Sequence, residues 1–488
     1  MHFFFFTPAL ETLFIHVVVV AVIAVRVIMM RPATGVALAW LLLAAMVPLL
    51  GALVYLLIGE RRIGAQREQG IKALRMDYRA IAEAETRQKL TNVDWSRHGP
   101  AAEGLDRLGR RIAGSPTVRG SRLEIRSNAV EMLKAIAREI DQAKTSVLME
   151  FYIWSEGGAA DEVLEAIIRA ARRGVACRLL LDAVGSRPWW NGEQPARLRE
   201  VGVLLQPALP VGFLRSVIER SDLRMHRKIV VIDGEVAWTG SMNLVDPRIF
   251  KQDAGVGEWV DAMVRIRGAA VAMLSGTMLG DWVLETSEPS ADLLRALCQE
   301  PARSDGPADV QVIPSGPAET GDGLLQMLLT LIGAAERELV LTTPYLVPDD
   351  SMLRALRSAA GRGVKVSMIV PEKVDSFLIR YASRSYYDSL LEMGVEIHLY
   401  RGGLLHTKSI MVDGTLSMFG TVNLDMRSLW LNYEVALFVY DQAFAADLKA
   451  LQQRYLEKSD RVDPAAWRAR AFAPRFLENA LRLASPLL

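Results

Sequence analysis

Residues 226–243 read HRKIVVIDGEVAWTGSMN, and residues 406–423 read HTKSIMVDGTLSMFGTVN. Both stretches follow the pattern His-x-Lys-x4-Asp-Gly and end on an asparagine, although they lie far apart in the chain. Apolar, β-branched runs flank an Asp-Gly pair in each, which predicts a strand, a tight turn and a returning strand. Residues i and i+2 of a strand point to the same face, so each histidine lies beside the lysine two positions later. Such a pair is suited to binding and attacking an anionic phosphate group.

Each motif ends a longer repeated unit. The first unit starts near residue 120 and contains MLKAIAREIDQAKTSVLMEFYIW, and the second contains LLQMLLTLIGAAERELVLTTPYLVP. In both, helical patterns alternate with short apolar strands in the same order, and the Pro- and charge-rich residues 299–310 connect the units. The sequence therefore predicts an α/β fold of two tandem domains related by duplication.

The duplication indicates how the two motifs act together. Two similar domains in one chain can pack about a pseudo-twofold axis, as the subunits of a homodimer do, and this would bring both His-Lys pairs into one cleft. One histidine would attack phosphorus while the other protonates the leaving alcohol and later deprotonates an incoming hydroxyl. We therefore expect His226, Lys228, His406 and Lys408 to be catalytic.

Other polar residues of the motifs have expected roles in this chemistry. Four are expected to bind the non-bridging phosphate oxygens: Ser241, Asn243, Thr421 and Asn423. A histidine used in this way needs a carboxylate on its other ring nitrogen, and Asp261 and Glu434 follow the two motifs. Asp233 and Asp413 are counted among the catalytic residues, although turn capping is an equally supported role for them.

The surroundings of the two histidines differ in the sequence. His226 is flanked by Arg224 and Arg227, whose charges would lower its pKa and keep it neutral and nucleophilic. His406 is expected to pair with Glu434, a carboxylate that stabilises the imidazolium needed to donate a proton. On these grounds His226 is the expected nucleophile and His406 the expected acid and base.

Two apolar stretches precede the repeated units. Residues 12–30 and 36–59 are each long enough to cross a bilayer as a helix, and a short loop separates them. A basic stretch follows, with Arg61, Arg62, Arg67, Lys72, Arg75 and Arg79. Because positive charges stay on the cytoplasmic side, the sequence predicts a two-span hairpin with residues 60–488 in the cytoplasm. The basic stretch could also contact anionic headgroups.

The composition argues against several other classes of protein. The chain carries 57 Lys and Arg against 56 Asp and Glu, so it lacks the basic balance typical of nucleic-acid-binding proteins such as nucleases. Its two cysteines, Cys177 and Cys298, lack metal-ligand spacing, and no P-loop or dinucleotide-binding motif is present. We expect no metal, no cofactor and no nucleic-acid partner.

The paired HxKxxxxD motifs resemble those of the phospholipase D superfamily. The stretches GSMNLVDPRIFKQDAGVGEWVDAMVRIRG, TTPYLVPDDSML and GTVNLDMRSLWLNYE, behind a two-span hairpin, are similar to bacterial cardiolipin synthases. The similarity covers essentially the whole chain. One departure is Met225, which stands where the family pattern has asparagine before the first histidine.

The resemblance implies two phospholipase D-like α/β sandwich domains and a phosphatidyltransferase. Two phosphatidylglycerol molecules would give cardiolipin and glycerol through a phosphohistidine intermediate. The implied partners are phosphatidylglycerol and other phospholipids, and the implied location is the bacterial inner membrane. A hydrolytic phospholipase D, or a phosphatidyltransferase with another lipid or alcohol acceptor, stays open as an alternative, and so does homo-oligomer formation.

The chain is expected to divide into five parts. These are a transmembrane hairpin (1–60), a basic juxtamembrane linker (61–118), two phospholipase D-like domains (119–300 and 308–472) and an amphipathic C-terminal tail (473–488). The apolar segment 207–220 is expected to contact acyl chains, with core packing as its alternative. The tail would either lie on the bilayer or cap the second domain.

Overall fold

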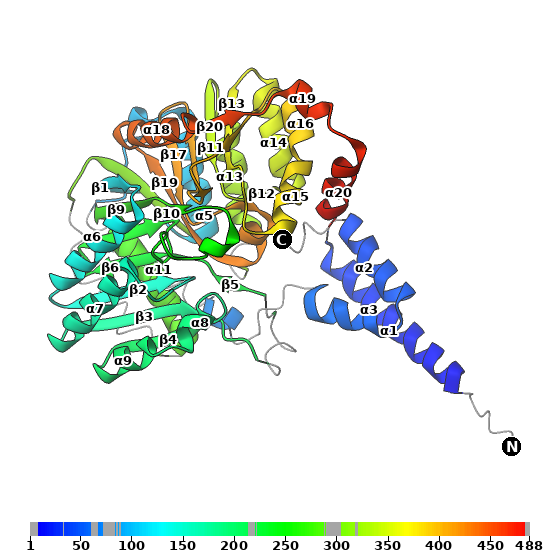
Figure 1. The fold of residues 1–488 in the computed structure, drawn as a ribbon, viewed down its shortest axis with the longest axis horizontal. Helices are drawn as coiled ribbons and strands as arrows, with labels where there is room; N and C mark the ends of the chain where they lie inside the picture. The colour runs from blue at the N-terminus through cyan, green and yellow to red at the C-terminus, as the bar shows by residue number, and fades with distance from the viewer. Residues whose placement is uncertain are drawn as a thin grey trace. The chain divides into compact units, whose positions relative to one another are not determined.

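The computed structural model describes residues 8–32, 34–59, 67–71, 89–212, 222–286, 304–317 and 321–483, together with residues 83, 86, 220 and 288. The chain divides into two compact units (Figure 1). The N-terminal unit comprises residues 1–66 and 211–222, and the main body comprises residues 67–210 and 223–488. Residues 213–219 of the expected acyl-chain segment, and residues 484–488 of the tail, lie outside the described residues.

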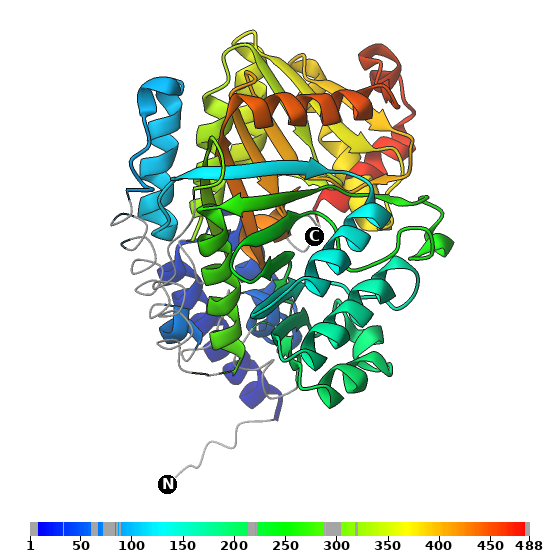
Figure 2. The same cartoon turned by 90° about the vertical axis from the view of Figure 1, so that its left-hand side faces the viewer.

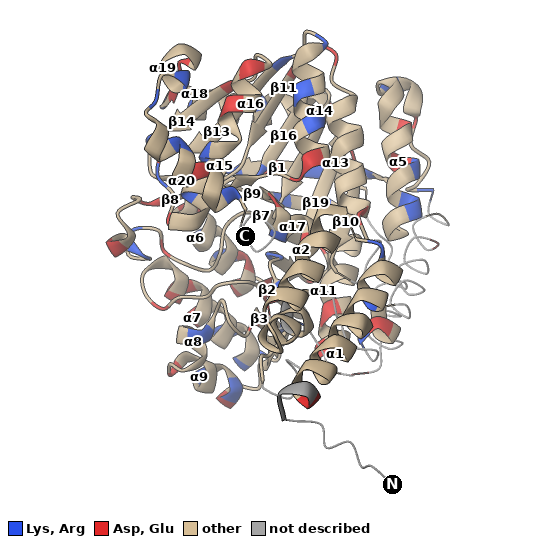
Figure 3. Ribbon diagram, turned by 90° about the vertical axis from the view of Figure 1, so that its right-hand side faces the viewer, with Lys and Arg blue, Asp and Glu red and all other residues tan. Residues whose placement is uncertain are grey.

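The N-terminal unit is built from apolar helices. α1 (Pro8–Met30) is the one helix among the described residues that is long and apolar enough to cross a membrane. The second apolar segment, expected as one helix, is divided into α2 (Thr34–Met46), α3 (Leu50–Val54) and a π-helix (Tyr55–Gly59). The division follows from Pro48, which lacks a backbone N–H, and from the positive φ of 58° at the next residue. Figure 3 shows α1 and α2 almost without charged side chains.

The main body is organised around one large mixed sheet (Figure 2). Its first half contains β1 (Val118–Arg126), β2 (Ser146–Phe151), β3 (Ala176–Asp182), β4 (Leu204–Ala208), β6 (Ile229–Ile232), β7 (Val236–Gly240) and β9 (Met263–Gly268). Its second half contains β10 (Ala308–Ser315), β11 (Glu338–Thr342), β13 (Lys365–Pro371), β14 (Glu396–Tyr400), β16 (Ser409–Val412), β17 (Leu416–Gly420) and β19 (Asn432–Tyr440). The strand–turn–strand prediction for both motifs is confirmed, because β6 pairs with β7 and β16 with β17 in antiparallel register.

The two halves repeat one strand order. The first half runs β4-β3-β2-β6-β7-β9-β1, and the second runs β14-β13-β11-β16-β17-β19-β10. In each half the outer three strands are parallel and the inner strands are antiparallel. β1 pairs with β10 and joins the halves. The repeated α/β organisation predicted from the sequence is thus present in the fold.

Helices cover both faces of the sheet. α6 (Ala129–Asp141) and α7 (Ala159–Arg172) pack on one face of the first half, and α13 (Gly323–Gly333) and α14 (Asp350–Gly361) on one face of the second. On the other face, α11 (Ala270–Thr286) and α18 (Gln442–Leu456) contribute Met278 and Leu448 to one core that contains strands of both halves. The two halves therefore share one apolar core on this face, and each keeps a core of its own on the other face.

Shorter elements complete the main body. The remaining helices are α5 (Pro100–Ala113), α8 (Arg187–Trp190), α9 (Gln194–Glu200), α15 (Phe377–Ser385), α16 (Tyr387–Glu392), α17 (Met426–Trp430), α19 (Pro464–Arg468) and α20 (Phe472–Arg482), with 3-10 turns at Trp95–Arg97 and Gln252–Ala254. The short strands are β5 (Arg224–Met225), β8 (Trp259–Val260), β12 (Leu346–Val347), β15 (Leu404–Leu405), β18 (Leu424–Asp425) and β20 (Ser459–Arg461). α5 lies in the expected linker, yet Ala102 and Leu105 are buried in the core of the second half.

Candidate active site

Each motif histidine is held by a strand from the opposite half of the main body. β5 pairs in parallel with β19, and the His226 N–H donates to the Tyr433 carbonyl at 2.9 Å. β15 pairs in parallel with β8, and the His406 N–H donates to the Val260 carbonyl at 2.9 Å. This exchange draws the two motifs toward one site, where the ammonium charge of each motif lysine acts on both histidines.

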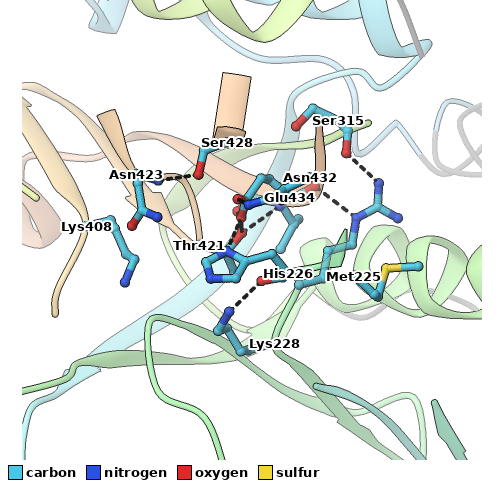
Figure 4. Close-up of polar contacts among 12 residues, drawn as sticks. Met225, His226, Lys228, Ser315, Lys408, Thr421, Asn423, Ser428, Asn432 and Glu434 are labelled. Carbon is cyan, nitrogen blue, oxygen red and sulfur yellow. Dashed lines mark hydrogen bonds and ion pairs between the residues drawn. The ribbon is translucent and has the colours of Figure 1, made fainter. Parts of the chain in front are cut away.

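The orienting carboxylates are exchanged between the halves as well, and Figure 4 shows Glu434 beside His226. Glu434 Oε2 lies 2.9 Å from His226 Nδ1, and Asp261 Oδ1 lies 2.7 Å from His406 Nδ1. The expected pairing of Glu434 with His406 is therefore wrong, because each carboxylate serves the histidine of the other half. A carboxylate at Nδ1 fixes a tautomer in which Nε2 carries a lone pair for chemistry.

Two motif hydroxyls support these carboxylates. Ser241 Oγ donates to Asp261 Oδ1 at 2.6 Å and accepts from the Ala262 N–H, while Thr421 Oγ1 donates to Glu434 Oε2 at 2.5 Å. A hydroxyl has one hydrogen to donate, and here that hydrogen is already used. The phosphate-binding role expected for Ser241 and Thr421 is therefore not what this geometry provides; both residues position a carboxylate.

The motif asparagines and lysines remain suited to binding an anion. Asn243 Oδ1 accepts from the Ile153 N–H at 3.1 Å, which leaves its amide hydrogens for a ligand. Asn423 is buried, its Oδ1 contacts no partner among the described residues, and Figure 4 shows its amide beside Lys408. The Lys228 and Lys408 ammonium groups are buried and donate to the carbonyls of their own motif histidines at 2.6 and 2.5 Å. Each ammonium keeps further hydrogens for phosphate oxygens.

Burial sets the protonation of the site. It lowers the pKa of His226 and of His406 to about 4, despite the opposing carboxylates, so both imidazoles are neutral in the free enzyme near pH 7. Burial also lowers the pKa of Lys228 to about 8 and lowers that of Lys408. For Glu434, burial acts to raise the pKa, but His226, Lys228 and a hydrogen bond from a threonine together hold it below its usual value.

The expected difference between the two histidines is not supported. Their pKa values are lowered equally, and burial is the main cause in both. Arg227 is fully buried and binds Asp281 together with the carbonyls of Glu434 and Ser315, at 2.9 and 3.0 Å. The flanking arginines therefore give no reason to prefer His226 as the nucleophile.

Asp233 and Asp413 lie at the far ends of the motif strands. Asp233 accepts from the backbone N–H groups of residues 144–146, and Asp413 from those of residues 336–338. A strand lies between each aspartate and the histidine of its motif. At a rise of about 3.3 Å per residue, this strand separates the carboxylate from the imidazole by roughly 20 Å. The catalytic role expected for both aspartates is wrong; they cap turns, in which each takes a positive φ of 52°.

Two protein families match this chain. A family described as "Cardiolipin synthase, PLD-like domain" matches residues 136–254 and 328–456, and the phospholipase D-nuclease N-terminal family matches residues 18–60. The chain is 42% identical to cardiolipin synthase A of Erwinia tasmaniensis over 480 residues, and 42% identical to that of Edwardsiella ictaluri over 476 residues. Each alignment covers 96% of both chains. This chain belongs to the cardiolipin synthase family with phospholipase D-like domains.

A solved structure supports the fold of this family member. The phosphatidylserine synthase of Haemophilus influenzae Rd KW20 matches with a TM-score of 0.61, covering 79% of this chain and all of that chain. The sequence identity is 16%, so the likeness concerns the fold alone.

Aromatic side chains from outside the two motifs lie beside the histidines. The Tyr152 ring lies 5.2 Å from the His226 ring, and the Trp259 ring lies 4.5 Å from the His406 ring, measured between centroids. Lys251 lies 5.5 Å from the Trp259 ring and forms an ion pair of 3.2 Å with Asp375. These residues come from loops and strand ends on both halves, and no periodicity or spacing in the sequence marks them.

A buried ionic cluster lies behind His226. Arg67, expected in a lipid-facing basic stretch, is 6% exposed and donates to Glu285 at 2.7 Å and to the Tyr433 hydroxyl at 2.9 Å. Its guanidinium lies 5.1 Å from the Tyr433 ring, whose backbone carbonyl holds His226. Glu150 lies at the same cluster, and burial together with Asp281 raises its pKa well above the usual value. The membrane-facing expectation for Arg67 is therefore corrected.

The described side chains at the corresponding position behind His406 are uncharged. There Thr407 Oγ1 lies 2.9 Å from the Tyr455 hydroxyl, and Gln452 donates to Ser409 Oγ at 3.1 Å. Each histidine thus has a carboxylate and a lysine as direct neighbours. Behind them the surroundings differ, with an ionic cluster at His226 and uncharged hydrogen-bonded side chains at His406.

Proposed function

We propose that this chain makes cardiolipin by transferring a phosphatidyl group from one phosphatidylglycerol molecule to another. The observation that carries the proposal is the exchanged pairing of His226 with Glu434 and of His406 with Asp261. Each imidazole has its Nδ1 on a carboxylate and a buried lysine beside it, and no described residue forms a hydrogen bond with its Nε2. The family to which the chain belongs acts on membrane phospholipids.

The first step forms the phosphatidyl-enzyme. Nε2 of one histidine attacks phosphorus, the phosphorus–oxygen bond to the headgroup glycerol breaks, and the leaving oxygen takes a proton from the other histidine. Lys228, Lys408, Asn243 and Asn423 would hold the non-bridging oxygens. An arriving phosphodiester anion raises the pKa of a nearby imidazole, so the substrate itself favours the imidazolium that serves as the acid.

The second step transfers the group. The histidine that gave up its proton now takes the proton from the headgroup hydroxyl of a second phosphatidylglycerol. The hydroxyl oxygen attacks phosphorus, the phosphorus–nitrogen bond breaks, and cardiolipin leaves with both histidines restored. One phosphodiester replaces another, so the reaction needs no nucleotide.

The finer organisation is part of the same proposal. The two halves would act as a pseudo-twofold pair, with domains at residues 119–300 and 308–472. Residues 12–30 and 36–59 would form a two-span hairpin in the bacterial inner membrane with the main body in the cytoplasm, and the break at Pro48 is tolerable within a helical span.

Product identity tests the function. Purified protein in detergent, given phosphatidylglycerol alone, is expected to release glycerol and cardiolipin in equal amounts. Phosphatidic acid as the main product would instead establish a hydrolase. A phosphatidyl ester of a different lipid or alcohol, formed in place of cardiolipin when that compound is supplied, would establish another acceptor.

A further inference from the structure

Two neighbouring helices near the end of the chain expose a cluster of large apolar side chains. α15 and α20 lie side by side in Figures 1 and 3 and are joined by the contact of Arg384 with Glu478 at 2.8 Å. The exposed side chains are Phe377, Leu378, Phe472, Phe476, Leu477 and Leu483, which we call the α15–α20 patch. Elsewhere in the described part of the main body, large apolar side chains are exposed only at Leu204 and Ile249.

α20 turns its apolar side to solvent and buries a charged side chain. A surface helix of a globular protein normally turns its apolar stripe to the core. Here Phe472 and Phe476 stack with centroids 5.8 Å apart on the solvent side, where they are 79% and 62% exposed. The buried side carries Glu478, which is 2% exposed and accepts from Arg384 and Arg470. Two ion pairs therefore fix the helix with its apolar stripe outward.

The exposed charges of these helices all have one sign. Arg380, Arg475 and Arg482 are exposed, whereas Glu478, the one carboxylate on either helix, is buried against two arginines. An apolar stripe bordered by arginines is the pattern of a helix that lies in the interface of an anionic bilayer.

The patch is close in the chain to the rim of the candidate site. Asp375, two residues before Phe377, accepts from the Tyr345 hydroxyl at 2.8 Å and pairs with Lys251. Lys251 in turn lies over Trp259, which contacts the His406 ring. A surface that docks at α15 would therefore meet the entrance to the site.

From these observations we infer that the α15–α20 patch is a membrane-docking surface that inserts its apolar stripe into an anionic phospholipid leaflet. It holds the rim of the site against the headgroups, from which phosphatidylglycerol enters. The inference rests on the proposed phosphatidyl transfer only for the identity of the lipid that enters.

Insertion can be measured without reference to activity. The full-length chain, with Phe476→Cys carrying a nitrobenzoxadiazole label and with Cys298→Ser, is reconstituted in vesicles of phosphatidylglycerol and phosphatidylcholine; Cys177 is buried and unlabelled. The label is expected to shift to the blue and to be quenched by acyl-chain spin labels. A label at Leu204, at the end of β4 away from the site, is expected to stay aqueous. A Phe476 label quenched only by aqueous iodide overturns the inference, and so does a blue shift that disappears when protein is diluted in the membrane, because that would show a second copy of the chain.

The catalytic consequence has its own control. Phe472→Ser with Phe476→Ser is expected to lower cardiolipin synthesis about tenfold on vesicle substrate and to leave the rate on detergent-dispersed phosphatidylglycerol unchanged. Leu204→Ser with Ile249→Ser is expected to change neither rate. Equal rates of the phenylalanine variant and wild type on vesicles overturn the inference. If the wild type makes no cardiolipin in detergent, the proposed function fails, while the label measurement still decides the docking.

Discussion

The chemistry of single residues depends on partners that are distant in the sequence. His226 and Glu434 are separated by 208 positions, and their side chains approach to 2.9 Å. His226 and Lys228 hold the pKa of Glu434 below its usual value, while burial and Asp281 raise the pKa of Glu150, an equally buried glutamate, well above its usual value. The two glutamates therefore offer a matched comparison between buried carboxyls whose pKa values are shifted in opposite directions.

Substitution of these glutamates by glutamine tests the exchanged pairing. Glu434→Gln removes the charge that orients His226, and kcat is expected to fall about 10²- to 10⁴-fold with KM for phosphatidylglycerol little changed. Glu150→Gln replaces a carboxyl of raised pKa by an amide of similar shape and is expected to keep kcat within a few-fold. Equal losses in both variants would show that burial, and not the charge on Glu434, matters.

The capping role of Asp233 predicts an effect on stability. Asp233→Ala leaves three backbone N–H groups without their acceptor, so the free energy of unfolding should fall by about 1–3 kcal/mol while kcat stays near the wild-type value. Thermal unfolding and steady-state kinetics in detergent check this. A large loss of kcat at unchanged stability would restore the catalytic role expected from the motif.

At the scale of elements, two short strands bring the motif histidines into position. β5 and β15 contain two residues each, and they cross to the opposite half to set the two histidines in place. Arg67 contributes a similar link, because it joins the segment that follows the N-terminal unit to Tyr433 on β19. The catalytic geometry around His226 is therefore tied to a residue more than one hundred positions before it.

Substitution of Arg67 tests this link. Arg67→Met leaves Glu285 as an unpaired buried charge, which is expected to lower the free energy of unfolding by about 3–5 kcal/mol and to reduce kcat. Arg67→Lys, which keeps the charge, is expected to recover part of both. Arg107→Met, a control whose ion pair with Glu103 is exposed to solvent, should leave both quantities nearly unchanged in detergent. An Arg67→Met variant that matches this control would contradict the structural role.

The sequence predicted the elements that carry strong local patterns. The motif hairpins, the repeated unit and the His-Lys pairs follow from two-residue periodicity and from turn residues, which act within a few positions. The exchange of Glu434 and Asp261 could not be predicted in this way, because two-residue strands have no periodicity and their pairing is tertiary. The break in the second apolar segment is marked in the sequence by Pro48. The burial of Arg67 could not be predicted, because in the sequence it is one of several membrane-proximal charges and its partner Glu285 is distant along the chain.

At the scale of the whole molecule, the two halves of the main body form one working unit. β1 and β10 join them in one sheet, and α11 and α18 pack into one apolar core. Each half supplies one histidine and the carboxylate for the other, so neither half holds a complete site. The central claim is that the two histidines divide one reaction, with one as nucleophile and the other as acid.

A substrate with an activated leaving group tests this claim most directly. Phosphatidyl-p-nitrophenol needs no proton on its leaving oxygen, so a variant that lacks only the acid can still form the phosphatidyl-enzyme. In rapid-mixing measurements on His226→Ala and His406→Ala, one variant is expected to release a stoichiometric burst of nitrophenolate and the other none. The burst identifies the variant that keeps the nucleophile. Bursts from both variants, or from neither while the wild type shows one, would contradict the division of labour.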